Sequence, residues 1–238
     1  MRRTAFLWIC CFLLVVVVGI APAGATRTSA NNTSTSYAGY LVGKAPSNAQ
    51  ATTEFTVPPL SCDSNQSGMF LGAYIEVPSN DQHVLVTEVG LDATCQDELP
   101  VYSAVYEFAG LGNGACHSRV CSFSPGDLIY VRVQQSPAGA SEILKDLTQH
   151  ENLGPASGAG TVNGQVLIGV TTNADNGSAL PIPAFSGLSF MKAKEDKSPP
   201  GSAKTKRLNL VSAVGTVLVK TSTLGAKGND WTESFENS

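Results

Sequence analysis

The chain has few charged residues and none of the short motifs that mark the common enzyme classes. Charged residues make up 14% of its 238 residues and the formal net charge is −4, so it lacks the basic surplus of a nucleic-acid-binding protein. It contains no G-x-S-x-G, no H-E-x-x-H, no phosphate-binding loop and no dinucleotide-binding fingerprint. A hydrophobic content of 42% is too high for a disordered chain. These observations indicate one folded domain that binds no nucleic acid.

The first 25 residues have the pattern of a secretory signal. Arg2 and Arg3 precede an apolar run, and the small residues at 23–25 match a signal-peptidase site. The run is shorter than the roughly 20 residues that a membrane-spanning helix needs, and an uncleaved anchor is the alternative. We therefore expect a secreted or extracytoplasmic protein with no stable membrane insertion after signal removal. The expected divisions are a signal peptide at 1–25, a flexible leader at 26–36 and the folded domain at 37–238.

Four cysteines remain after the signal, namely Cys62, Cys95, Cys116 and Cys121. An even number in an exported chain implies disulfides, and four cysteines allow three pairings. Cys116 and Cys121 are close in sequence around an expected turn, which favours Cys116–Cys121 together with Cys62–Cys95. No C-x-x-C pair is present and His117 is the only nearby imidazole, so we expect neither a metal nor another cofactor.

The rest of the sequence predicts strand after strand and no convincing helix. In residues 101–108 the large apolar side chains fall on one face, while Ser103, Val105 and Glu107 fall on the other. Short strands between Gly-, Pro-, Asn- and Ser-rich turns predict an all-β fold, a sandwich or a barrel. Residues 142–150 would form a helical turn or the end of a strand. The expected strands lie at 51–57, 70–77, 83–89, 101–108, 128–133, 165–170, 208–211 and 215–220.

Residues 192–207 differ from the rest of the chain in charge. They hold six of the 15 lysine and arginine residues, together with Pro199, Pro200 and Gly201. We expect a solvated loop. The alternatives are an electrostatic patch for an acidic partner and a protease-sensitive loop.

Carboxylates on strands are the candidates for chemistry. Glu88 follows an apolar run, and Glu107 shares a strand face with Ser103 and Val105. Two carboxylates on one concave sheet would suit general acid–base catalysis. The simpler explanation is that each lies on the solvent side of a half-buried sheet.

Six short segments follow one another in the order typical of a known family. They are YAGYLV at 37–42, ATTEFTVP at 51–58, GAYIEV at 72–77, TEVGLD at 87–92, AVYEF at 104–108 and SPGD at 124–127. This order resembles the eqolisins, the glutamic peptidases, over most of residues 37–235. The resemblance implies a concanavalin-like antiparallel β-sandwich of two curved sheets. It also implies acid endoproteolysis by a Gln and a Glu on the concave sheet.

The resemblance carries over to the catalytic pair residue by residue. The family's catalytic Gln falls on Glu88. Its catalytic Glu falls on Gly169, which has no side chain to polarise water or to donate a proton. No Glu or Asp occurs between Glu151 and Asp175, so a shift in the alignment does not restore the missing acid.

Other positions of the family's site also change. Tyr74 and Val105 stand where the family has active-site tryptophans, Ser103 replaces an Asp, and Glu107 stays as the family has it. A less aromatic groove weakens stacking on sugars. This favours a peptide or protein ligand over a glycan.

These inferences predict an exported, catalytically inactive eqolisin-like protein that binds an extended peptide or protein segment, or less favourably a glycan. The alternative is an acid endopeptidase of the glutamic type, a hydrolase, with Glu88 catalytic and Glu107 as its partner. A third possibility is a structural surface protein whose groove is filled by its own side chains. The residues expected to line the concave groove are Tyr74, Glu88, Ser103, Val105, Glu107 and Gly169.

Overall fold

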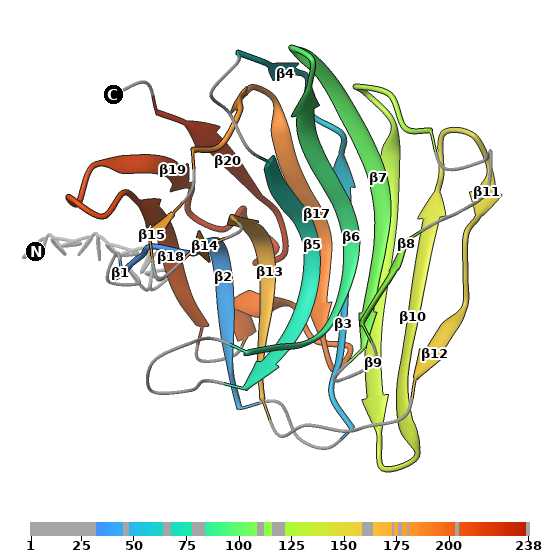
Figure 1. The fold of residues 1–238 in the computed structure, drawn as a ribbon. Coiled ribbons are helices and arrows are strands. Elements are labelled where there is room, and N and C mark those ends of the chain that lie inside the picture. Colours follow the sequence, from blue (N-terminus) through green and yellow to red (C-terminus); the bar gives the residue numbers. More distant parts are fainter. Residues whose placement is uncertain are drawn as a thin grey trace, which may run out of the picture.

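The computed structural model consists almost entirely of β-strands (Figure 1). The only helical segment in the described part of the chain is the 3₁₀ turn η1 (Pro200–Ser202). No described helix is long and apolar enough to cross a membrane. The structure describes residues 32–44, 48–63, 68–77, 84–108, 112–115, 122–158, 164–172, 174–175, 178–179, 181–202 and 205–236.

A 16-stranded sheet curls on itself to form a sandwich of two layers. In pairing order its main path is β11 (Glu151–Asn152), β10 (Gly139–Asp146), β9 (Leu128–Ser136), β3 (Gln50–Thr56), β17 (Leu188–Glu195), β20 (Trp231–Phe235), β19 (Val217–Thr221), β18 (Thr205–Val211), β2 (Tyr37–Lys44), β13 (Gln165–Thr172), β5 (Gly68–Val77), β6 (Val84–Gln96), β7 (Leu99–Phe108) and β8 (Gly112–Ala115). Off this path lie β1 (Asn32–Ser34), which pairs in parallel with β18, and β12 (Ala156–Gly158), which pairs with β10. Two small ladders complete the set: β4 (Leu60–Ser61) with β16 (Ala184–Phe185), and β14 (Ala174–Asp175) with β15 (Ser178–Ala179).

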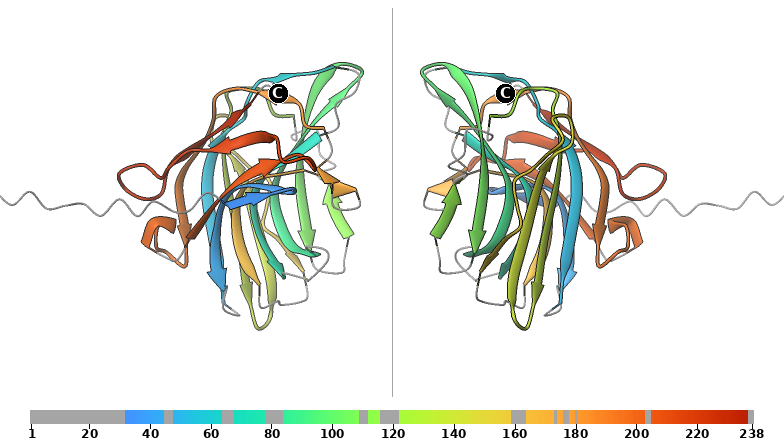
Figure 2. Two further views of the ribbon diagram at one scale, coloured as in Figure 1. Left: turned by 90° about the vertical axis from the view of Figure 1, so that its left-hand side faces the viewer. Right: turned by 90° about the vertical axis from the view of Figure 1, so that its right-hand side faces the viewer.

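The main hydrophobic core lies between the two layers. Strands β10, β9, β3 and β17 form one layer, and β2, β13, β5, β6 and β7 form the other. Figure 2 shows the molecule from two sides, with β18, β19 and β20 joining the layers along one side. Strands β3, β9 and β10 alternate buried and partly exposed residues, because successive side chains of a strand point to opposite faces. The fold is therefore the expected antiparallel β-sandwich.

The strand predictions agree with the structure in type and place. In β7, Tyr102, Ala104 and Tyr106 lie in the core between the layers, as their alternation predicted. The strand β6 is longer than expected and ends at Gln96. The sheet also begins before Tyr37, because β1 pairs with β18.

One alternative is settled and one expectation was wrong. Residues 142–150 contain the end of a strand and not a helical turn, because β10 ends at Asp146 and pairs along its whole length with β9. Residues 192–207 are not one solvated loop, because β17 continues to Glu195 and β18 begins at Thr205. A register shift between Met191 and Lys194 lets β17 pair with β3 in spite of its lysines.

One predicted disulfide is present. Cys62 and Cys95 are bonded, with their Cα atoms 5.5 Å apart, and this bond ties the segment after β4 to the end of β6. Cys116 and Cys121 lie outside the described residues, so their pairing stays a prediction.

Candidate functional site

The layer formed by β2, β13, β5, β6 and β7 carries the candidate site on the face that points away from the main core. Val89 and Leu91 of β6 point into the main core, so Glu88 and Asp92 point the other way. We call this surface the Glu88 face. The strands β5, β6 and β7 bend along their length beneath it (Figure 1).

Two glutamates stand side by side on the Glu88 face. Glu88 of β6 and Glu107 of β7 are direct partners in the antiparallel ladder. Burial, then the charge of Glu107, then a hydrogen bond to Glu107 raise the pKa of Glu88 to about 9. Glu88 is 6% exposed, and its Oε2 has no hydrogen-bond partner. The pair can therefore share one proton across a wide pH range.

A second polar pair lies four residues along the same strands. Asp92 of β6 is the ladder partner of Ser103 of β7, and both are partly exposed. Burial and the charge of Glu107 raise the pKa of Asp92. The Glu88 face thus presents a strip of three carboxyl groups and one hydroxyl.

A row of glycines crosses the sheet between these two polar pairs. Neighbouring strands bring together Gly39, Gly169, Gly72 and Gly90, and the row ends at Val105. A Cβ atom at Gly169 would lie 2.0 Å from the carbonyl oxygen of Ala38 and 2.8 Å from the Cα of Gly39. The backbone of β2 therefore leaves no room for a side chain at Gly169.

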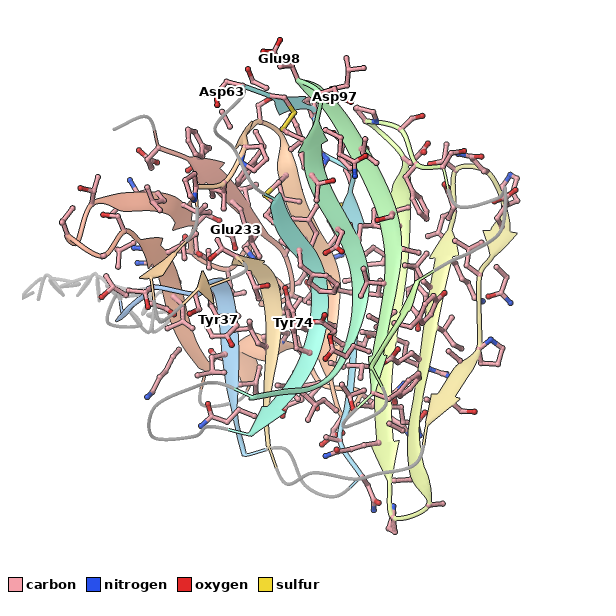
Figure 3. The ribbon with its side chains drawn as sticks, in the orientation of Figure 1. Tyr37, Asp63, Tyr74, Asp97, Glu98 and Glu233 are labelled. Carbon is pink, nitrogen blue, oxygen red and sulfur yellow. A yellow bond between two sulfur atoms is a disulfide. The ribbon has the colours of Figure 1, made fainter. Side chains whose placement is uncertain are left out.

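Two aromatic rings fill the space above the glycine row. The ring of Phe70 would touch a Cβ at Gly72 or Gly90 at 2.7–2.8 Å. The Tyr74 ring lies 4.9 Å from that of Phe70, centroid to centroid. The Tyr74 hydroxyl donates toward the carbonyl oxygens of Phe70 (3.3 Å) and Gly169 (3.5 Å). Figure 3 labels Tyr74 near the middle of the sheet, with Tyr37 beside it.

These rings belong to a second, smaller apolar cluster that covers part of the Glu88 face. Tyr74 is completely buried, and burial followed by the charge of Glu88 raises its pKa well above the ordinary value. These side chains take up space on the Glu88 face that an open cleft would leave free for a ligand. The members of the cluster are Tyr37, Phe70, Tyr74, Val105, Leu167 and Leu208.

All six residues predicted for the groove share this face, although their roles stay predictions. Glu88 and Glu107 are adjacent, Tyr74 is the ladder partner of Glu88, and Val105 is the partner of Gly90. Among the described residues no three His, Cys, Asp or Glu side chains are grouped to hold a metal ion. Acid–base chemistry and hydrogen bonding by the carboxyl groups are what this arrangement can perform.

Sequence reasoning missed a third glutamate behind the pair. Glu142 of β10 is fully buried between the layers, and neither carboxyl oxygen has a hydrogen-bond partner. Burial, then the charges of Glu88 and Glu107, raise its pKa to about 10. The alternation of residues in β10 is the signal that could have placed Glu142 in the core. No strand was predicted there, so the signal was missed.

Comparisons with known proteins agree with this description. The structure is similar to scytalido-glutamic peptidase with a transition state analog inhibitor, with a TM-score of 0.66 and 16% identity over 85% of this chain and 98% of that one. It is also similar to aspergilloglutamic peptidase from Aspergillus niger, with a TM-score of 0.54 and 20% identity over 72% and 100% of the two chains. A search of curated protein sequences gave no match. The model of the peptidase A4 family matches residues 35–230, and the chain belongs to that family.

Proposed function

We propose that this protein is an exported member of the peptidase A4 family that does not cleave peptides and binds an extended peptide segment on its Glu88 face. The predicted signal at 1–25 and the Cys62–Cys95 disulfide support export, since disulfides persist in oxidising compartments. The family membership supports a peptide as the ligand.

The observation that carries this proposal is the surroundings of Gly169. The resemblance to glutamic peptidases puts their catalytic Glu at this position, where the backbone of β2 leaves no room for a side chain. The Phe70 ring lies over the neighbouring Gly72 and Gly90, and the Tyr74 hydroxyl donates toward the carbonyl oxygen of Gly169. The absence of the family's catalytic Glu thus involves the packing of neighbouring strands as well as the change of one residue.

The polar strip supports peptide binding without catalysis. Protonated Glu88 can donate a hydrogen bond, and ionised carboxylates can accept bonds from peptide N–H groups. Ser103 can do both. An extended peptide presents alternating N–H and C=O groups, which match such a strip of mixed donors and acceptors.

Hydrolysis of an acid-unfolded protein between pH 2 and 5 tests the catalytic half of the proposal. The wild-type protein, shown to be folded by circular dichroism, should leave the substrate intact. Glu88→Gln and the matched exposed control Glu98→Gln should behave alike. Cleavage by the wild type that Glu88→Gln abolishes and Glu98→Gln retains would overturn it.

Fluorescence anisotropy with labelled disordered casein tests the binding half. Ser103→Arg should weaken binding, because a long side chain would cover the polar strip. Ser141→Arg, a matched change on a strand of the other layer, should leave binding unchanged. Equal affinities for the two variants would place the bound casein elsewhere on the surface.

The second candidate is an acid endopeptidase, favoured by the direct pairing of Glu88 with Glu107. One carboxylate would remove a proton from water as the water oxygen attacks the peptide carbonyl carbon. The other, protonated, would give its proton to the carbonyl oxygen, and the C–N bond would break as the amine gains a proton. The hydrolysis experiment above separates this candidate from the first.

A further inference from the structure

We infer that the outer face of β9, β3 and β17 is a binding site for an acidic polysaccharide. This surface, here called the lysine face, belongs to the layer that does not carry the Glu88 face. It therefore stands apart from the proposed peptide site, and neither proposal depends on the other.

The ladder pairings place polar side chains from three neighbouring strands in rows. Arg132 of β9, Thr52 of β3 and Lys194 of β17 form one row. Tyr130 and Glu54 form the next. Alternate residues of these strands are buried in the core, so the named side chains all point outward.

The bulge in β17 gathers lysines at this surface. The register shift between Met191 and Lys194 turns Lys192 outward, and its Nζ forms an ion pair with Glu54 at 2.9 Å. Lys194 and Lys197 are exposed and form no ion pair among the described residues. The Nε atom of Arg132 is buried and has no hydrogen-bond partner. Positive charge is thus left unpaired here in a chain of net charge −4.

A cavity of about 360 Å³ opens on the lysine face. Of the nearby acidic groups, Glu54 is paired with Lys192, and Asp196 accepts a hydrogen bond from the backbone N–H of Gln50 at 2.9 Å. The cavity is large enough for one sugar ring, within the range of small-ligand sites. Its lining includes Gln50, Thr52, Tyr130, Lys192, Lys194 and Lys197.

The cavity on the lysine face, which has room for a sugar ring, favours a polysaccharide as the ligand. The strand β3 lies between β9 and β17, so its backbone groups are engaged in the ladders. The side chains that line the cavity offer amide, hydroxyl, phenol and ammonium groups, and the carboxylate of Glu54, which is paired with Lys192. These match the hydroxyl groups of a sugar and its carboxylate or sulfate.

Titration calorimetry with the full folded protein tests the inference. Dextran sulfate and polygalacturonate should bind, whereas uncharged dextran of matched length should not. Binding should weaken as salt rises, because exposed charges are screened. The double variant Lys194→Ala/Lys197→Ala should weaken binding by roughly tenfold or more, and the matched exposed control Lys220→Ala should not.

The outcomes separate the possible ligands. Binding of dextran sulfate alone identifies a sulfated sugar, and binding of polygalacturonate as well identifies the charge common to both. Binding of poly-L-glutamate but of neither polysaccharide would overturn the inference in favour of an acidic peptide. Equal losses in the double variant and in Lys220→Ala, or no binding at all, would also overturn it.

Discussion

Glu142 and Glu233 are two buried glutamates on opposite sides of the molecule, and the protein holds them in different ways. Glu233 of β20 (labelled in Figure 3) lies in a buried site. It accepts hydrogen bonds from the Trp231 Nε1–H and the Thr221 hydroxyl, each at 2.8 Å. Glu142 of β10 has no partner for either oxygen. Burial raises both pKa values, to about 8 for Glu233 and about 10 for Glu142. Glu233 is thus held by hydrogen bonds to its neighbours, whereas Glu142 is buried without such bonds as a protonated, neutral acid.

Glu88 lies between these two extremes. It hydrogen-bonds to Glu107, but its Oε2 is unpaired. A buried polar atom without a partner costs free energy unless a ligand or water completes it. The two glutamates thus differ: the hydrogen bonds of Glu233 are complete, whereas Glu88 on the candidate site keeps one buried oxygen without a partner.

The largest expected effect is on the pH dependence of stability. Glu88, Glu142 and Glu233 have an ordinary pKa of 4.5, and their folded values lie near 9, 10 and 8. Above pH 4.5 the unfolded chain loses these protons first. Stability is therefore fully present below pH 4.5 and is lost as pH rises through 8 to 10. Urea unfolding at pH 4, 6 and 8 should show a steady fall.

Single Glu→Gln variants show which group causes this fall. Between pH 4 and 8 the two variants should flatten the pH profile to a similar extent, and above pH 8 Glu142→Gln should flatten it more, because its folded pKa of about 10 exceeds the value of about 8 for Glu233. An unchanged slope in both variants would mean that other groups cause the pH dependence. The exposed Glu98→Gln serves as the control.

The next largest expected effect is the loss of stability when the hydrogen-bonded carboxyl group of Glu233 is removed. Glu233→Ala leaves the indole N–H of Trp231 and the hydroxyl of Thr221 without this acceptor in a buried site, so we expect a loss of about 2–4 kcal/mol. Chemical denaturation at pH 5 measures it. Glu233→Gln keeps one acceptor oxygen and should lose less. Equal losses in the two variants would mean that packing, and not hydrogen bonding, holds Glu233 in place.

Replacing Glu142, whose carboxyl group has no hydrogen-bond partner, should instead increase the stability of the fold. Glu142→Met removes a polar group without breaking a bond and keeps the side-chain length, so we expect a gain of about 1–2 kcal/mol at pH 8. The midpoint of urea unfolding measures it. Glu142→Gln, which stays polar, should gain less. A loss in Glu142→Met would indicate a buried partner such as water.

These residues also show what the sequence could and could not predict. The strand at 101–108 was predictable because the residues at its core positions, such as Tyr102 and Ala104, are apolar. The strand β10 has the same period, but Glu142 and Asp146 occupy core positions and conceal it. Asp146 is polar there because its carboxylate accepts the backbone N–H groups of Thr148 and Gln149 in the following turn.

The candidate site was predictable only in part, because some of its features depend on contacts between residues far apart in the sequence. That Glu88 and Glu107 share a face followed from local alternation and the resemblance. The row that brings Gly169 beside Gly39 and Gly72 depends on pairing between strands far apart in the sequence. Phe70 gave no local signal that its ring would cover that row.

The smallest expected effect concerns Glu88 itself. Burial and Glu107 raise the pKa of Glu88 to about 9, so folding at pH 8 requires this carboxyl group to take up a proton. Glu88→Gln puts a neutral amide there that can donate a hydrogen bond to Glu107, so we expect a gain of about 0.5–1.5 kcal/mol at pH 8. At pH 4 the unfolded chain is largely protonated too, so the gain should vanish. Urea unfolding at both pH values measures the difference. A gain that persists at pH 4 would show that charge repulsion is not its source, and the two glutamates would then not act as a proton-sharing pair.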